Sequence, residues 1–288
     1  MRRNGPLALV SLLSTIALMA LLYGPAAPQA LQAGGSAPVN AIELPIIMYH
    51  SVLNSEDKAG AYVVTAKQLE RDLAYIQALG YTTVVVQDLL DYVYGGVPLP
   101  DKPVMLTFDD GYYNNYTYLY PLLEQYDMKA VLSIIAVHTE QYTQSGERNN
   151  NYTHITWPQL REVAAAGRIE IQNHTYDMHS ERTRRGAVSV QGESFSHYKE
   201  AITEDILQAQ KMIQANTGWT CTAFTYPFGF YTNQSEAIVR SMGFRCSLTC
   251  VEGMNYIDRD PSCLFALKRW NRASGLGSEA FFRDKLHA

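Results

Sequence analysis

Strand-like and helix-like segments alternate along nearly the whole chain, and this alternation constrains the fold more than any other feature. Short apolar or β-branched runs, such as residues 44–52 and 104–108, are typical of buried strands. Between them lie segments with one apolar face at helical spacing, such as residues 65–80, which begin at a capping Thr65 and end at Gly80. Such alternation predicts a parallel sheet with right-handed crossovers, either open or closed into a barrel.

The N-terminus has the pattern of an export signal. Arg2 and Arg3 precede residues 6–24, which contain no charge, and a segment of small residues follows with room for a cleavage site at residues 30–33. The apolar stretch is close to the roughly 20 residues that span a membrane. We therefore assign residues 1–36 to a signal peptide or membrane anchor and residues 37–288 to one domain. That domain is expected outside the cell or at its surface.

Charge and cysteine content narrow the class of protein. The net charge of −5 argues against a nucleic-acid groove, which needs clustered Lys and Arg. An even number of cysteines in an exported chain predicts disulfides. The pairing among the four is left open by the sequence: Cys221, Cys246, Cys250 and Cys263.

Polar and metal-capable residues follow several of the predicted strands. The carboxyl ends of parallel strands meet at one edge of a sheet, so these residues are expected to lie close together. They are His50; Asp109 and Asp110; His174, Asp177 and His179; residues 225–229; and Arg269, Asn271 and Arg272.

The histidine pair and the aspartate pair among these residues could together form a metal site. His174 and His179 are five residues apart, which would separate their rings by roughly 140° on a helix, so a shared metal requires a turn after the strand. Adjacent Asp109 and Asp110 point in different directions, so one carboxylate can bind a metal while the other acts as a base. One Asp and two His leave coordination positions open, as catalytic metal sites do.

Three motifs in this order, "TFDDGY", "NHTYDMH" and "TYPFG", resemble the polysaccharide deacetylase family, carbohydrate esterase family 4, with its NodB-homology domain. The resemblance extends over residues 44–272 and implies a distorted, incomplete (β/α) barrel. "MYHSV" and the five-residue histidine spacing are similar to the branch that contains poly-N-acetylglucosamine deacetylases.

The resemblance implies a role for each matched residue. Asp109 would be the general base. The backbone N–H of Phe228 would bind the developing oxyanion, and the neighbouring side chains would help to wall the groove. The metal ligands would be Asp110, His174 and His179, holding zinc most often, with cobalt or nickel as alternatives. The residues assigned to substrate binding are Tyr226, Pro227 and Arg269.

The sequence departs from the family pattern at two points. Many members carry an arginine where this chain has Thr225, and either Arg269 or Arg272 could supply that charge. Many members also have a late Leu-X-His acid, for which His287 at the extreme C-terminus is a poor match. His50 is the better candidate for the acid, against the equal alternative of a satisfied core histidine. Asp177 fits a turn residue better than a partner of a ligand histidine.

The prediction is an exported, metal-dependent polysaccharide N-deacetylase that acts as a monomer and meets a membrane only through its N-terminal segment. One alternative is a carbohydrate-binding relative with impaired catalysis, since the usual arginine is missing. Another is an esterase acting on acetyl esters, because an activated water attacks either carbonyl. The polymer is left open among peptidoglycan, poly-N-acetylglucosamine, chitin oligomers and acetylated xylan.

Overall fold

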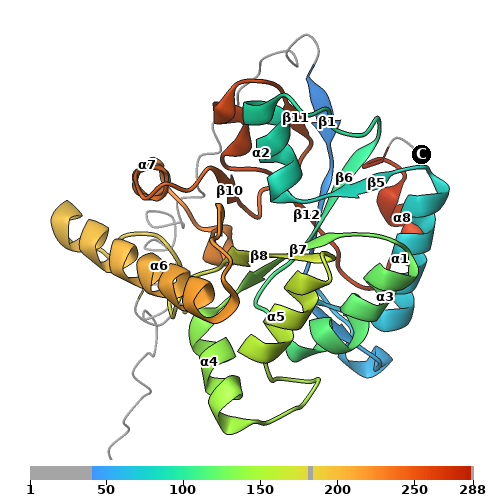
Figure 1. Ribbon diagram of the computed structural model, residues 1–288, viewed down its shortest axis with the longest axis horizontal. Coiled ribbons are helices and arrows are strands. Elements are labelled where there is room, and N and C mark those ends of the chain that lie inside the picture. The colour runs from blue at the N-terminus through green and yellow to red at the C-terminus, as the bar shows by residue number, and fades with distance from the viewer. Residues whose placement is uncertain (1–40, 181–183, 287–288) are drawn as a thin grey trace, which may run out of the picture. The chain divides into compact units, whose positions relative to one another are not determined.

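An eight-stranded, wholly parallel sheet forms the centre of the computed structural model, which describes residues 41–180 and 184–286 (Figure 1). The predicted leader (residues 1–36) and His287 lie outside these described residues. Seven strands follow one another across the sheet, and the eighth pairs with β6. In that order they are β10 (Cys246–Leu248), β9 (Ala223–Thr225), β8 (Ile169–Asn173), β7 (Ala130–Ile134), β6 (Pro103–Phe108), β2 (Ile46–Tyr49) and β12 (Trp270–Asn271), with β5 (Thr82–Val84) beside β6.

The sheet is curled into an open half-barrel, which confirms the predicted incomplete (β/α) barrel. The distortion is visible at β6, which pairs with β5 through Pro103–Met105 and with β7 through Thr107–Phe108. At the far ends, an isolated bridge joins Leu248 of β10 to Leu267, just before β12. Two small sheets accompany the main one: β1 (Ile42–Leu44) with β11 (Asn255–Ile257), and β3 (Ser51–Leu53) with β4 (Val63–Thr65).

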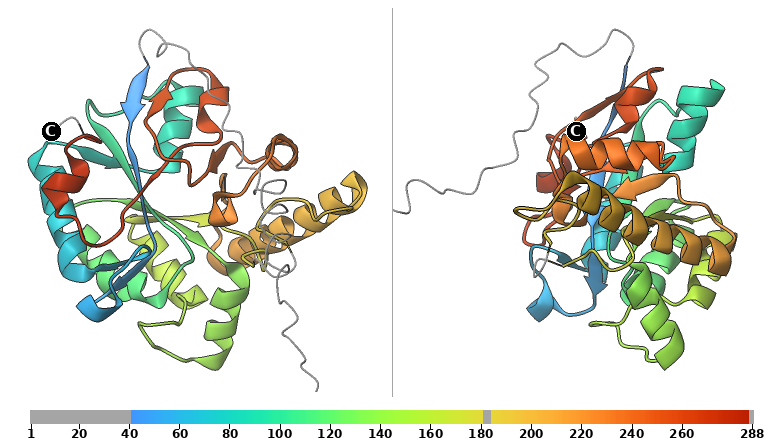
Figure 2. Two further views of the ribbon diagram at one scale, coloured as in Figure 1. Left: turned by 180° about the vertical axis from the view of Figure 1, so that it is seen from behind. Right: turned by 90° about the vertical axis from the view of Figure 1, so that its left-hand side faces the viewer.

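Helices surround the curled sheet, and Figures 1 and 2 show them lying around the outside of the strands. A π-helical segment, η2 (Asn115–Leu119), leads into α3, and short 3₁₀ segments occur at η1 (Glu56–Lys58), η3 (Pro227–Gly229) and η4 (Pro261–Leu264). The α-helices are α1 (Ala66–Ala78), α2 (Val86–Gly95), α3 (Tyr120–Gln125), α4 (Ala136–Ser145), α5 (Trp157–Ala165), α6 (Phe195–Thr217), α7 (Asn233–Ser241) and α8 (Ser278–Phe282).

Local sequence signals account for much of this architecture. Strands β2, β6, β7 and β8 are buried along their whole length, as expected for apolar runs covered on both faces. The Thr65 hydroxyl caps α1 by accepting a hydrogen bond from the Gln68 N–H at 3.0 Å, as predicted. Among the described residues, no helix is long and apolar enough to cross a membrane.

Two predicted elements differ from the structure. The apolar run at residues 129–137 was expected to be one strand, but β7 ends at Ile134 and α4 begins at Ala136. Periodicity alone cannot separate a short apolar strand from the start of a buried helix. The strand expected over residues 264–272 is reduced to β12 (Trp270–Asn271): η4 ends at Leu264, and Ala266 has a φ of 54°, which interrupts an extended strand.

The expectation of disulfides is wrong for this structure, because all four cysteines are free. Cys221 and Cys246 are buried, and burial raises the pKa of each thiol, so both behave as small apolar core residues. The Cys250 sulfur lies 3.6 Å from the Met48 sulfur.

Candidate active site

The polar residues that follow the parallel strands gather at one edge of the sheet. His50 follows β2, Asp109 and Asp110 follow β6, His174 follows β8, and η3 follows β9. All are at the carboxyl ends of strands in one parallel sheet, where ligands and substrates usually bind in such folds.

Asp110, His174 and His179 come together as predicted. The Asp110 Oδ1 atom lies 3.6 Å from His174 Nε2 and 3.3 Å from His179 Nε2. Potential ligand atoms of the three side chains all lie within 4.8 Å of one another. Within residues 41–180 and 184–286, no other group of three or more His, Cys, Asp or Glu side chains meets this condition.

The chemistry of this group fits a divalent metal. The Asp110 Oδ1 atom is buried and has no hydrogen-bond partner, an arrangement that is costly for a carboxylate unless a cation completes it. The Nδ1 atom of His174 lies 2.8 Å from the Thr225 carbonyl oxygen. Because a carbonyl only accepts, Nδ1 carries a proton, and Nε2, which faces Asp110, is the nitrogen that can offer a lone pair to a metal.

The three side chains shift one another's pKa values. Burial alone would raise the pKa of Asp110, but the interaction with His174, with His50 and His179 nearby, lowers it overall. Burial would lower the pKa of His174, which Asp110 and Asp109 raise instead. Burial and the neighbouring His174 lower the pKa of His179 to about 4. Asp110 therefore stays ionised, as a metal ligand must be.

The backbone turns sharply where these ligands sit. Asp110 and Gly111 both adopt positive φ angles, of 72° and 75°, and a Cβ atom at Gly111 would lie 2.9 Å from a side-chain carbon of Ile134. Such left-handed residues cluster at functional sites, where the surrounding structure holds them. The glycine of "DDG" is thus required by both conformation and space.

The five-residue histidine spacing arises from a turn, as predicted. Thr175 has a φ of 84°, and its N–H donates to the Asn173 side-chain oxygen at 2.8 Å. Asp205 of α6 accepts hydrogen bonds from the N–H groups of Tyr176 and Asp177, both at 2.8 Å, and so holds the chain that returns to His179. The side chain of Asp177 is exposed, in agreement with its interpretation as a turn residue. Sequence reasoning missed Asp205, because it lies on a helix remote from every motif.

Asp109 faces a different partner from Asp110. Both of its carboxylate oxygens accept hydrogen bonds from the Arg269 guanidinium, each at 2.8 Å. Arg269 also donates to the Thr249 carbonyl and to the Thr107 hydroxyl, at 2.7 and 3.1 Å. Burial alone would raise the pKa of Asp109, but the charge and hydrogen bonds of Arg269 more than offset burial and lower it. Asp109 is thus an ionised carboxylate beside the potential metal ligands.

This geometry corrects the role predicted for Arg269. The side chain is completely buried and fully engaged, so it is not available to contact substrate. It supplies instead the charge that many family members place at the position of Thr225. The alternative, Arg272, pairs with the buried Asp72 elsewhere in the fold.

The predicted substrate contacts of Tyr226 and Pro227 need the same correction. Tyr226 is completely buried, and its hydroxyl donates to Glu236 at 2.8 Å. Pro227 is also buried. The turn at η3 directs Phe228 to the site instead: its φ is 57°, and its ring centroid lies 4.2 Å from that of His179. The oxyanion role of the Phe228 N–H stays a prediction.

His50 lies among the same charged groups. Its Nδ1 atom is buried without a hydrogen-bond partner, and its ring centroid is 4.9 Å from that of Tyr62. Burial lowers the pKa of His50, against the opposing charges of Asp109 and Asp110. An imidazole with an unpaired nitrogen next to two carboxylates fits a proton carrier better than a satisfied core histidine, and its assignment as the acid stays a prediction.

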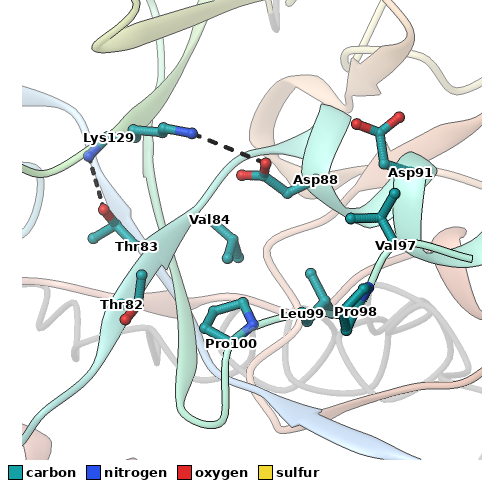
Figure 3. A pocket seen from close by; sticks show the side chains of 10 residues that line it. All are labelled: Thr82, Thr83, Val84, Asp88, Asp91, Val97, Pro98, Leu99, Pro100 and Lys129. Atoms are coloured by element: carbon teal, nitrogen blue, oxygen red, sulfur yellow. Dashed lines mark hydrogen bonds and ion pairs between the residues drawn. The ribbon is translucent and has the colours of Figure 1, made fainter.

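A small cavity of about 190 Å³ lies elsewhere and contains none of the predicted site residues (Figure 3). It is bounded by β5, by residues 97–100 and by Lys129, whose amine lies 3.9 Å from Asp88. Residues 97–100 precede β6 and Lys129 precedes β7, so this cavity is at the amino-terminal edge of the sheet. It is separate from the candidate active site.

Comparison with known proteins agrees with this architecture. The poly-β-1,6-N-acetyl-D-glucosamine N-deacetylase of Escherichia coli K12 is 25% identical over 92% of this chain, which spans only 44% of that relative's length. A solved de-N-acetylase from Aggregatibacter actinomycetemcomitans superposes with a TM-score of 0.73, at 24% identity, over 85% of this chain and all of its own. IcaB from Ammonifex degensii superposes with a TM-score of 0.65, at 25% identity, over 79% of this chain and 91% of its own. A family model described as polysaccharide deacetylase matches residues 96–247, more than half of the chain. The chain belongs to the polysaccharide deacetylase family.

Proposed function

We propose that this protein is an exported, metal-dependent deacetylase that hydrolyses N-acetyl groups of a polysaccharide containing N-acetylglucosamine. The observation that carries the proposal is the difference in surroundings between two adjacent aspartates. Arg269 holds Asp109 through two hydrogen bonds, whereas Asp110 faces His174 and His179. A site that only bound metal or sugar would have no use for a second, separately held carboxylate.

Asp110, His174 and His179 would hold one divalent metal, with zinc the first candidate and cobalt or nickel also suited to these ligands. Such a metal, when bound, would polarise the acetyl carbonyl and acidify a water molecule. Asp109 would accept the proton of that water as its oxygen attacks the carbonyl carbon. The Phe228 N–H would donate to the developing oxyanion.

His50 would deliver a proton to the nitrogen as the carbon–nitrogen bond breaks. The products would be acetate and a free amine on the sugar. His50 suits this step because it is half-buried and electrostatically coupled to both Asp109 and Asp110.

Relatives and charge support the choice of substrate. Several relatives are named poly-β-1,6-N-acetyl-D-glucosamine N-deacetylases, and the matched region is part of each. The substrate is a neutral polymer, and this chain has neither a strongly basic nor a strongly acidic balance at a net charge of −5. The apolar N-terminal segment supports export to the cell surface or beyond it.

A carbohydrate-binding protein without turnover is less well supported. That alternative rests on Thr225, which occupies the position where many family members carry an arginine. Arg269 reaches Asp109 from a distant part of the sequence and provides the missing charge.

Acetate release from β-1,6-linked N-acetylglucosamine oligomers tests the proposal. We expect the full chain to release acetate, to lose this activity on chelation and to regain it when zinc is added. Asp177→Asn, an exposed aspartate in the same region, is the matched control and should stay active. Release that survives exhaustive chelation, or that occurs only from acetyl esters, would overturn the proposal. β-1,4-linked oligomers in parallel would identify the preferred polymer.

A further inference from the structure

Tyr62 is a large aromatic side chain that lies exposed beside the candidate active site. It is 61% exposed, the highest value among the large hydrophobic residues that the structure describes as exposed. Its ring packs against that of His50, with centroids 4.9 Å apart and planes at 65°. His50 in turn is coupled electrostatically to Asp109 and Asp110. Tyr62 therefore contacts a side chain, His50, that interacts directly with the two aspartates of the candidate active site.

The backbone that carries Tyr62 is held firmly in place. The Tyr62 carbonyl accepts a hydrogen bond from the Ser51 N–H at 3.1 Å. The Ala61 carbonyl accepts from the Asn271 side chain at 2.9 Å, and the Gly60 carbonyl from the Ser274 N–H at 3.0 Å. An exposed ring on an anchored backbone loses little conformational entropy when it binds a ligand.

A second exposed tyrosine lies on the neighbouring loop. Tyr152 is 49% exposed, and its hydroxyl donates to Glu147. The Lys58 amine donates to the Asn151 side chain at 2.8 Å and so joins the loop of Tyr62 to the loop of Tyr152. The loop of Tyr152 is attached to the site as well, because the Thr153 carbonyl accepts from the Tyr113 N–H at 2.8 Å.

We infer that Tyr62, with Tyr152 further along the same rim, is a platform on which sugar rings of the polysaccharide stack next to the sugar that is deacetylated. The inference rests on the proposed function, which supplies the substrate class. The faces of N-acetylglucosamine rings present C–H groups and no charge, which suits a flat apolar ring with a polar tip. The platform determines preference for long chains and takes no part in the chemistry.

The test compares oligomers of different length with Tyr62→Ala, Tyr62→Phe and Tyr152→Ala. Tyr94→Ala is the control, because Tyr94 is similarly exposed at 45% but lies at the end of α2, far from the site. For a pentamer, Tyr62→Ala should raise KM about tenfold, the size of one aromatic stacking contact, and leave kcat within about twofold. For an acetylated monosaccharide or an aryl acetate it should change nothing. Tyr62→Phe should restore the wild-type KM, and Tyr152→Ala should act only on the longer oligomers.

Equal KM values for the wild type and Tyr62→Ala across all lengths would overturn the inference. So would an equal loss on the pentamer and the monosaccharide, which would indicate a role at the reacting centre. Calorimetric binding of the pentamer separates this inference from the proposed function. If the wild type releases no acetate but binds the pentamer more tightly than Tyr62→Ala does, the platform stands while the enzymatic proposal fails. Equal binding by the two proteins refutes the platform regardless of turnover.

Discussion

Two buried arginines, Arg269 and Arg272, lie three residues apart, and each donates two hydrogen bonds to one buried aspartate. Arg269 donates two hydrogen bonds of 2.8 Å to Asp109. Arg272 donates hydrogen bonds of 2.8 and 3.0 Å to Asp72. All four side chains are at most 2% exposed. The two pairs are thus matched in chemistry and burial, although Arg269 donates through both terminal nitrogens and Arg272 through Nε and one terminal nitrogen.

The surroundings of the two aspartates differ. Asp72 also accepts hydrogen bonds from the hydroxyls of Tyr49 and Ser278, at 3.0 and 2.7 Å, so both oxygens are saturated inside the fold. Asp109 receives side-chain hydrogen bonds only from Arg269 among the described residues, and it lies beside Asp110 and His174. A carboxylate has about four acceptor sites, so Asp109 retains the capacity to bind a proton or a water. The same ion pair therefore stabilises the fold in one place and prepares a base in the other.

A third buried carboxylate shows what happens without an arginine. Glu170 of β8 accepts hydrogen bonds from the Gln87 N–H and the Gln172 side chain, at 2.9 and 2.7 Å. Burial, which no cation offsets, raises its pKa to about 7. By contrast, the Arg269 guanidinium lowers the pKa of Asp109 despite the burial of that carboxylate.

The largest expected effect is on catalysis, from Asp109→Asn. We expect kcat/KM to fall by about 10²- to 10⁴-fold, the usual contribution of a general base. Acetate release measured well below the unfolding temperature would check this. Asp72→Asn is the matched control and should keep kcat/KM within about twofold per folded molecule. A similar loss in both variants would mean that the two pairs serve the same purpose.

Asp72→Asn should have its effect on stability instead. Breaking a buried pair leaves the Arg272 charge uncompensated, which typically costs about 3–5 kcal/mol. Denaturant unfolding monitored by circular dichroism measures this change in the free energy of unfolding. A loss below about 1 kcal/mol would show that Arg272 and Asp72 are not needed to hold the C-terminal segment on α1.

Glu170 should make the protein less stable as the pH rises. Its folded pKa of about 7 exceeds the ordinary value of 4.5, so between these values the folded state binds more protons than the unfolded state. The contribution is fully present below pH 4.5 and is lost as the pH approaches 7, by about 3 kcal/mol at most. Glu170→Gln should flatten this part of the stability–pH curve, whereas Glu200→Gln, at an exposed position on α6, should not. An unchanged slope in Glu170→Gln would contradict the assignment.

The smallest expected effects come from replacing each arginine by lysine. Lysine keeps the charge but loses the two parallel hydrogen bonds. Arg269→Lys should lower kcat/KM by about tenfold, and Arg272→Lys should lower the free energy of unfolding by about 1–2 kcal/mol with little change in kcat/KM. Parallel kinetic and unfolding measurements would show whether the two effects separate. The reverse pattern would exchange the roles of the two pairs.

Sequence reasoning predicted the parallel half-barrel and the residues at its strand ends, because both follow from local patterns. Apolar runs identify strands, and the carboxyl ends of parallel strands converge, so Asp110, His174 and His179 could be expected together. The choice between Arg269 and Arg272 could not be made, because their partners are 160 and 200 positions away in the sequence. An offset of three in an extended segment places side chains on opposite faces, but which face meets the site depends on the whole sheet.

The errors around Tyr226 and Pro227 have a similar cause. Both follow a strand, as the other site residues do, but the turn at η3 directs them inward and brings Phe228 to the site. The direction of a side chain after a strand depends on turn geometry, which the motif alone does not determine.

Zinc binding by Asp109→Asn and Asp110→Asn tests most directly whether the two adjacent aspartates divide the roles of base and ligand. Equilibrium dialysis of each variant, followed by acetate release from the same samples, gives both properties. We predict that Asp109→Asn binds one zinc ion as the wild type does but releases acetate about 10²- to 10⁴-fold less efficiently, whereas Asp110→Asn loses the zinc. Loss of zinc in Asp109→Asn, with retention in Asp110→Asn, would contradict the account.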